Sequence, residues 1–281
     1  MPASSSLRLI LLPLVASAFL FTSGCGGGGG GGGDGDDGFP TPKLPAGAAR
    51  LDGANANDIA TTAVDFVGTL DTLAELKSEE SPSLTAVTRR VTDRIMRQRR
   101  TSTSVAARTE DISDGLCDTG KAVATYEESG SSESGSVTFT ECDIGGIEID
   151  GRFLFEASFN PTTLAYSFEA GGELTVAAAG ETITIEMHLL ESGNDGTGDF
   201  TSTVSFSLSG IPGGGFLLTT TQAWVGNAFS AVTTDGQLIV YGSDNTRIRI
   251  TVTAINTASV ELDNGSGTFV PLPPPDDTIL F

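Results

Sequence analysis

This 281-residue chain has 36 acidic residues, so pairs of carboxylates are expected by chance and do not indicate an acid–base site. His188 is the only histidine, and Glu186 precedes it on the same predicted strand face. A general base needs a nearby nucleophile or metal, and no second histidine or motif serine accompanies His188. The G-x-S-x-G elbow, HExxH, the P-loop and the dinucleotide fingerprint are all absent. We therefore interpret His188 as a surface residue and expect no catalytic residues and no cofactor.

The best candidate for a cation site is the loop N-D-G-T-G-D, with the side-chain oxygens of Asn194, Asp195 and Asp199. Calcium prefers about six to eight oxygen ligands in a loop bent by glycine. This loop has only two carboxylates and lacks the terminal glutamate of an EF-hand. We therefore favour a solvated hairpin loop and expect no metal site.

Cys117 and Cys142 are the cysteines of the C-terminal part of the chain. In an exported protein an isolated pair most often forms a disulfide. A two-thiol metal site is the alternative, but it lacks histidine partners. The sequence therefore predicts a disulfide, and closing this loop of about 26 residues would contribute roughly 3–4 kcal/mol.

An apolar stretch from Leu9 to Phe21, preceded by Arg8, predicts a secretory signal over residues 1–24. It is shorter than the ~20 residues that a spanning helix needs. The alternative to a lipoprotein leader is an ordinary signal peptide with a chance cysteine near its end. An unbroken run of eight glycines, Gly26 to Gly33, follows Cys25 and favours an anchored protein, because glycine-rich chain behaves as a flexible tether.

The ending T-S-G-C at Cys25 resembles the lipobox of bacterial lipoproteins, with Thr22 where that family usually has leucine. The resemblance implies cleavage before Cys25 and attachment of lipid to it, so that the membrane is a partner through the anchor. In that family an aspartate after the cysteine favours the inner membrane. Gly26 at that place implies a cell-envelope protein of the outer membrane.

The formal charge of −21 is confined to the C-terminal part of the chain. From Thr109 onward 25 acidic residues face 4 basic ones, whereas residues 1–108 carry 11 of each. Such a negative field excludes nucleic acid as a partner and opposes adhesion to anionic head groups.

Residues 25–57 have no periodicity and are predicted to be the lipidated cysteine and a Gly/Asp/Pro tether, followed by a helical segment over 58–108. A first helix over 58–77 is indicated by the apolar spacing of Ile59, Ala63, Phe66, Leu70 and Leu73, with Asn57 or Asp58 as its cap. A second helix, 83–100, has Leu84, Val87, Val91 and Ile95 on one face and arginines on the other. This helix could bind a membrane surface or dock on the acidic domain, and the charge distribution favours docking. Residues 101–113 are predicted to be linker.

The pattern then changes to a period of two, which predicts an antiparallel β domain over 109–281. In 182–190, for example, Ile183, Ile185, Met187 and Leu189 alternate with polar residues. Strand candidates are separated by turn residues, including Gly145-Gly146, Gly171-Gly172, the loop at 193–199, and Asp235-Gly236. Their ranges are 121–127, 136–144, 147–159, 163–170, 173–179, 181–191, 200–211, 215–225, 228–234, 237–242, 247–254, 259–262 and 268–272.

We therefore expect a mainly β fold, an antiparallel meander forming a curved sheet or incomplete barrel with one or two N-terminal amphipathic helices packed on it. This architecture resembles periplasmic lipoprotein carriers of the half-barrel kind. The segment from Thr234 to Phe269, with its turn at Asp263 to Gly267, resembles the C-terminal part of uncharacterised bacterial envelope lipoproteins.

The function that we expect is that of a non-enzymatic, membrane-anchored envelope lipoprotein, a binding or structural module for an unknown envelope protein or lipid. The alternative is a carrier that holds a lipid or acyl group on the concave face, beside Phe153, Phe155 and Phe159. A hydrolase with an unrecognised site would require carboxylates clustered around His188 in a cleft.

Overall fold

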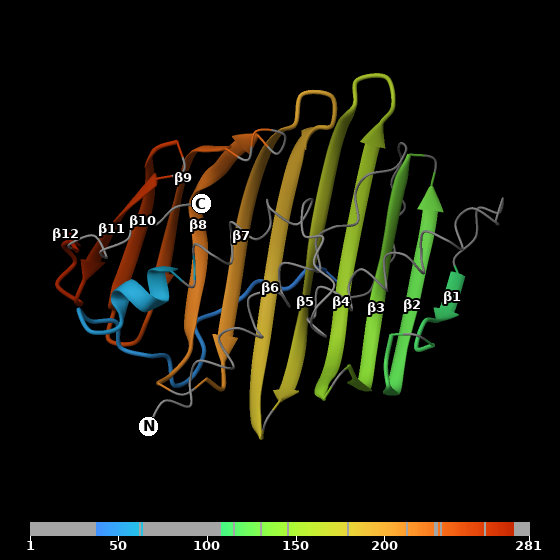
Figure 1. Cartoon of the computed structure of the whole chain (residues 1–281), viewed down its shortest axis with the longest axis horizontal. Helices are drawn as coiled ribbons and strands as arrows, with labels where there is room; N and C mark the ends of the chain where they lie inside the picture. The colour runs from blue at the N-terminus through green and yellow to red at the C-terminus, as the bar shows by residue number, and fades with distance from the viewer. Residues whose placement is uncertain are drawn as a thin grey trace.

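The chain has a mainly β structure, which we describe from a computed structural model (Figure 1). The structure describes residues 38–61, 63, 108–114, 116–129, 131–144, 146–178, 180–211, 213–227, 230, 232–255 and 257–272. Within these residues the strands are β1 (Arg108–Asp111), β2 (Thr119–Ser129), β3 (Ser132–Asp143), β4 (Ile147–Asn160), β5 (Ala165–Ala178), β6 (Glu181–Asn194), β7 (Asp199–Ser209), β8 (Phe216–Asn227), β9 (Val232–Tyr241), β10 (Arg247–Ala254), β11 (Thr257–Asp263) and β12 (Val270–Pro271). No helix in the part of the chain described here has the length and apolarity needed to cross a membrane.

The strands form a single antiparallel sheet in which the spatial order is the same as the sequence order. The predicted antiparallel meander is therefore confirmed. The sheet is open and uncurled, with β1 and β12 at opposite edges (Figure 1), so the curved sheet or incomplete barrel is not confirmed. Pairing only between sequence neighbours builds a wide ribbon, and closing a barrel would need its two edges to pair as well.

The two faces of the sheet differ as the period of two predicts. On β6, Ile183, Ile185, Met187 and Leu189 are buried, whereas the residues between them are exposed or half-buried. We call the face of these four side chains the inner face, and the opposite one the outer face. The inner face continues across the sheet in a hydrophobic core cluster that includes Phe168, Val204, Leu218, Leu238 and Ile250.

The N-terminal described segment crosses from the outer face to the inner face. In Figure 1 this segment (blue) passes behind the central strands, rounds the lower edge of the sheet and enters a helical turn (cyan) in front of it. At the edge, the Ala49 amide donates to the Gly215 carbonyl at 2.7 Å, and the Leu51 amide donates to Thr246 Oγ1 at 3.0 Å. Leu51 itself is fully buried in the core cluster. Part of the predicted tether, 38–57, is therefore packed on the domain.

The described helical residues are 56–61 and 63, so this helix begins before the predicted start at Asp58. Asp52 and Asn55 cap it reciprocally: the Ala54 amide donates to Asp52 Oδ1 at 2.8 Å, and the Asp52 amide donates to Asn55 Oδ1 at 2.9 Å. The capping residues are thus neither Asn57 nor Asp58. Ala56, Ala60 and Ala63 are its fully buried side chains. The rest of the predicted first helix, and the whole of the second over 83–100, lie outside the described residues.

Two predicted turns, at Gly171-Gly172 and at Asp235-Gly236, are wrong, because their glycines allow close packing inside continuous strands. β5 runs through Gly171 and Gly172, and a Cβ on Gly172 would lie 2.2 Å from the Arg152 carbonyl oxygen of β4. β9 runs through Gly236, which has a φ of 146°. A Cβ there would lie 2.5 Å from the ring of the buried Trp224. The predicted linker 101–113 is also corrected, since it contains β1.

Candidate functional site: the outer face of the central strands

The register of the sheet aligns five hydroxyl side chains into one row across the outer face. Neighbours in this row are directly opposite each other on adjacent strands, and its members, in order from β3 to β7, are Ser132, Ser158, Ser167, Ser192 and Thr201. We call this the hydroxyl row. All five residues are exposed or half-buried. Ser158 Oγ and Ser167 Oγ are hydrogen-bonded at 2.6 Å, which links the row at its centre.

A second row runs beside the first, two residues away from it on each strand, and contains two carboxylates. Its members are Ser134, Glu156, Glu169, Leu190 and Thr203, again in direct register from β3 to β7. We call this the carboxylate row. Glu156 and Glu169 are directly opposite each other, an arrangement that normally destabilises a sheet. Leu190 is an exposed apolar residue, with 45% of its surface accessible.

These two rows form a groove of about 410 Å³, to which they contribute most of the lining residues. This volume is within the range of small-molecule sites, about 300–1,000 Å³. The groove crosses β3 to β7, the broad central part of the sheet in Figure 1. Its surface offers hydroxyl donors and acceptors together with carboxylate acceptors.

His188 lies on the outer face of β6, two residues before Leu190 of the carboxylate row, and is directly opposite Gly171 of β5. Its Nε2 is hydrogen-bonded to Glu169 Oε1 at 2.8 Å, so the histidine holds a carboxylate that lines the groove. The ring of Phe39 stacks on the imidazole, with centroids 5.6 Å apart and an interplanar angle of 8°. Gly171 makes room for this contact, because a Cβ there would lie 3.1 Å from Pro40 Cδ.

The surroundings of His188 do not assemble a nucleophile and a base. Ser205, directly opposite it on β7, has its hydroxyl 3.4 Å from Thr219 Oγ1. Among the described residues, no hydroxyl is hydrogen-bonded to His188. The geometry therefore gives the imidazole a positioning role toward Glu169, at the border of the groove.

In the loop 194–199, a candidate cation site that we interpret from the sequence as a solvated hairpin, Asn194 and Asp199 accept hydrogen bonds from protein groups. Asn194 Oδ1 accepts from the amides of Gly196 and Thr197, at 2.8 and 3.2 Å. Asp199 accepts from Asn227 Nδ2 and from Thr197 Oγ1, both at 2.8 Å, and these bonds, that of Asn227 first, lower the pKa of the Asp199 carboxyl. Asp195 is exposed. The described residues contain no group of three or more His, Cys, Asp or Glu placed to hold a metal ion.

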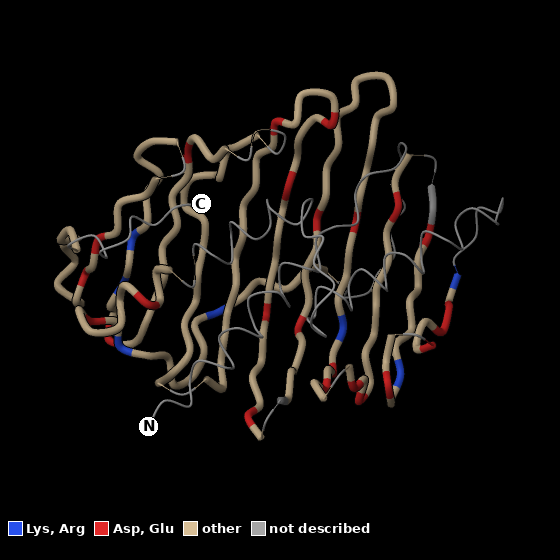
Figure 2. Tube along the Cα trace, in the orientation of Figure 1, with Lys and Arg blue, Asp and Glu red and all other residues tan. Residues whose placement is uncertain are grey.

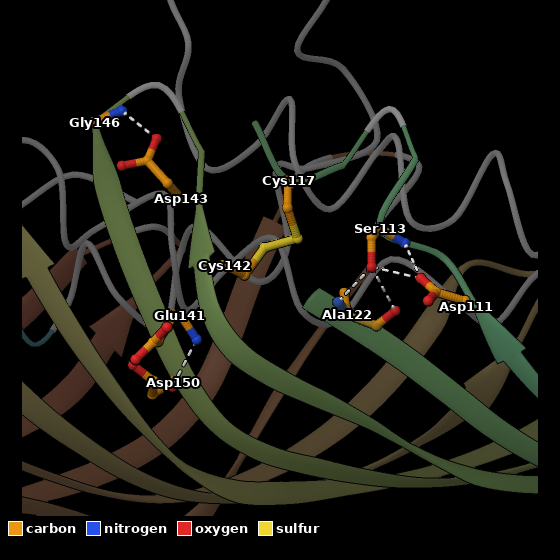
Figure 3. The surroundings of a disulfide bond; sticks show 9 residues. All are labelled: Asp111, Ser113, Cys117, Ala122, Glu141, Cys142, Asp143, Gly146 and Asp150. Carbon is orange, nitrogen blue, oxygen red and sulfur yellow. Dashed lines mark hydrogen bonds between the residues drawn. A yellow bond between two sulfur atoms is a disulfide. The ribbon is translucent and has the colours of Figure 1, made fainter. Parts of the chain in front are cut away.

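Cys117 and Cys142 form a disulfide, as the sequence predicts (Figure 3). The bond joins the segment before β2 to β3, and Cys142 is fully buried. Next to it, Glu141 has a φ of 47° in a bulge of β3, and its amide donates to Asp150 Oδ1 at 2.8 Å. The disulfide therefore fixes the irregular end of the sheet, away from the groove.

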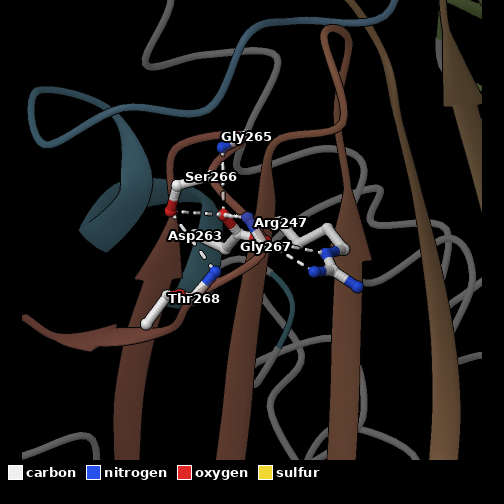
Figure 4. A network of polar contacts seen from close by, with 6 residues as sticks. All are labelled: Arg247, Asp263, Gly265, Ser266, Gly267 and Thr268. Carbon is white, nitrogen blue, oxygen red and sulfur yellow. Dashed lines mark hydrogen bonds and ion pairs between the residues drawn. The ribbon is translucent and has the colours of Figure 1, made fainter.

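Asp263 organises the turn that connects β11 and β12 (Figure 4). Its Oδ1 accepts from the amides of Gly265 and Gly267, at 3.0 and 2.9 Å, and its Oδ2 accepts from Arg247. The Arg247 guanidinium, followed by the two glycine amides, lowers the pKa of this carboxyl. With its side chain buried and its acceptors occupied in this way, Asp263 has a structural role.

Glu191, a half-buried carboxylate on the inner face of β6, is not among the residues predicted from the sequence. Tyr166 Oη donates to Glu191 Oε1 at 2.9 Å, and burial raises the pKa of this carboxyl. The alternation itself contained the signal, because Glu191 continues the series Ile183, Ile185, Met187 and Leu189.

The hydroxyl row was also not predicted from the sequence. Its serines are visible in the sequence, but their alignment depends on the register of four strand pairs.

Cys25, the predicted site of lipid attachment, lies outside the described residues.

Comparisons with profiles of protein families, with curated proteins and with solved structures found no match for this chain.

Proposed function

We propose that this chain is a lipid-anchored protein of the bacterial cell envelope, and that its sheet is a non-enzymatic binding module that uses the outer-face groove. The proposal of location rests on the signal-like leader, on the lipobox-like T-S-G-C at Cys25 and on the glycine run that follows. The outer membrane is the membrane that we propose, because Gly26 follows the cysteine.

The observation that carries the binding role is the difference between the two faces of β4 to β7. The inner face is occupied by the hydrophobic core, whereas the outer face has a groove lined by hydroxyls and carboxylates. Replacing Cys25 should therefore change membrane attachment, whereas substitutions in the groove should change ligand binding.

The carrier alternative receives less support from the same residues. Phe153 is buried in the core cluster and Phe155 packs against that cluster, so these rings contribute to the core. The groove lies on the other face and carries a row of hydroxyls and two carboxylates, whereas a carrier needs an apolar cavity for an acyl chain.

We also propose that the predicted helices pack on the inner face. Support comes from the described helical turn, whose Ala60 and Ala63 are already buried in the core cluster. Val91→Asp should then lower the melting temperature clearly, and Arg90→Gln with Arg97→Gln should change it little, because exposed ion pairs contribute only about 0–1 kcal/mol. Arginine variants that keep their stability but no longer bind anionic vesicles would instead favour the membrane role.

Fractionation of cells that express the full chain tests the anchor. The mature protein should partition into the detergent phase, and Cys25→Ser should leave an unprocessed or soluble precursor. If Cys25→Ser partitions like the parent protein, the proposed lipid anchor at Cys25 is wrong.

The binding role is tested by crosslinking. A photo-crosslinking amino acid at Thr203, in the groove, should capture an envelope component, whereas one at Thr184 should not. Equal capture from both positions, or capture from neither, would contradict the proposal.

A further inference from the structure

We propose that the groove binds an uncharged oligosaccharide that lies across strands β3 to β7. This inference rests on the proposed function and names the class of ligand for the same site. It follows from the spacing of the hydroxyl row, from the chemistry of the carboxylate row and from the charge of the surrounding surface.

The hydroxyl row provides a repeating set of hydrogen-bonding groups. Adjacent strands are about 4.8 Å apart, so the five residues of the row span roughly 19 Å in a direction perpendicular to the strands. A chain of linked sugar rings presents hydroxyls at a repeat of similar length. Each hydroxyl of the row both donates and accepts, which matches the dual character of a sugar hydroxyl.

The carboxylate row supplies the stronger and more directional contacts. Glu156 and Glu169 accept hydrogen bonds only, and a bond from a sugar hydroxyl to a carboxylate is charge-assisted. His188 fixes Glu169 through the 2.8 Å contact, so this carboxylate is oriented before a ligand arrives. The opposed carboxylates repel each other, and hydroxyl donors placed between them would relieve this cost.

Leu190 provides an apolar contact in the same groove. It is exposed on the outer face between Glu169 on β5 and Thr203 on β7. The C–H face of a sugar ring is apolar, and it can cover such a side chain while its hydroxyls contact the flanking polar groups. The groove thus combines the apolar and polar parts that a carbohydrate requires.

The charge of the domain selects against other ligands. Acidic residues are spread over the described chain and basic ones are few (Figure 2), so an anionic polysaccharide or a phosphate would be repelled. The described residues contain no group of three or more His, Cys, Asp or Glu placed to hold a multivalent cation. An apolar ligand would leave the hydroxyl row without hydrogen bonds.

Titration calorimetry with the intact protein in detergent tests the inference. The probes are neutral gluco-, malto- and chito-oligosaccharides of increasing length, compared with an anionic uronate oligomer and with Ca²⁺ alone. We expect one neutral series to bind with an affinity that rises with length and levels off at about five units, because roughly one ring fits each strand of the row. The uronate and Ca²⁺ should not bind.

Two matched double variants connect binding to the groove. Glu156→Gln with Ser192→Ala removes one group from each row and should weaken binding at least about tenfold. Glu186→Gln with Thr184→Ala makes the same kinds of change on the outer face of β6, outside the groove, and should leave the affinity unchanged. Far-UV circular dichroism should show that both variants are folded.

The inference is overturned if none of the neutral oligosaccharides binds, if the uronate or Ca²⁺ binds instead, or if both double variants weaken binding equally. The proposed function is judged separately by fractionation and by crosslinking from Thr203. Capture of an envelope protein from Thr203, without binding of any oligosaccharide, would retain the binding module and reject the glycan as its ligand.

Discussion

The inner and outer faces of β4 to β7 are built from alternate residues of the same strands, yet they have different tasks. On β6, Leu189 is fully buried and its neighbour Leu190 is 45% exposed. Burial of the inner face stabilises the folded state, because it removes apolar surface from water, at about 25 cal/mol per Å². The outer face instead presents the hydroxyls, the carboxylates and Leu190 of the groove to solvent, so its side chains are available for binding. Four predictions test this division.

Leu189→Ala and Leu190→Ala make the same chemical change on opposite faces. Leu189→Ala should lower the free energy of unfolding by about 2–5 kcal/mol, because it leaves a cavity in the core. Leu190→Ala should change it by less than about 0.5 kcal/mol, as an exposed substitution usually does. Urea unfolding of both variants measures the difference. Similar losses in the two variants would mean that the outer face is also part of the stabilising core.

The disulfide should contribute nearly as much as a large core residue. Replacing Cys117→Ala and Cys142→Ala together should lower the free energy of unfolding by about 3 kcal/mol, because the unfolded chain loses a crosslink of 25 residues in sequence separation. Because Cys142 is on the inner face of β3, this variant tests whether apolar burial alone holds that end of the sheet. Thermal unfolding with and without reductant should coincide for the double variant, and it should differ for the parent protein.

Phe39→Ala should have a smaller effect, because it removes one stacked ring contact on the outer face. Loss of the stacked contact with His188 should cost about 0.5–1.5 kcal/mol. Leu44→Ala, in the same segment but 42% exposed, is the control. A loss comparable to that of Leu189→Ala would show that the segment is essential to the fold.

Glu191→Gln should have the smallest effect, and it should be a gain. Burial raises the pKa of Glu191, so the folded state prefers the neutral carboxyl, and this contribution to stability is lost as the pH rises through the folded-state pKa. Glutamine imitates the neutral form and still accepts from Tyr166. The melting temperature should therefore exceed that of the parent protein at pH 7, and the two should converge below about pH 4.5, the ordinary glutamate value.

Glu148→Gln, on the exposed outer face of β4, is the control for this comparison. Melting temperatures measured across the pH range should show no comparable gain for it. An equal gain in both variants would point to the reduction of the overall negative charge, and not to burial at Glu191.

The sequence by itself determined the class of fold, the sidedness of the strands and the disulfide. A period of two requires only the local geometry of an extended chain, so the burial of Ile183, Ile185, Met187 and Leu189 was predictable. The pairing of Cys117 with Cys142 was predictable for another reason, because the chain has only these two cysteines after Cys25. The loop at 194–199 was readable because its turn residues satisfy one another locally.

The tertiary structure decided where residues on different strands meet. Gly171 and Gly236 resemble turn glycines in the sequence, but they lie inside strands, where the approach of Pro40 and Trp224 leaves little room for a Cβ. The hydroxyl row exists only because four successive strand pairs adopt one register, and a shift of one residue in any of them would move its serine out of line. The environment of the half-buried Glu191 likewise depends on residues of neighbouring strands, such as Tyr166. Such alignments are set by packing over the whole sheet, and no local pattern in the sequence encodes them.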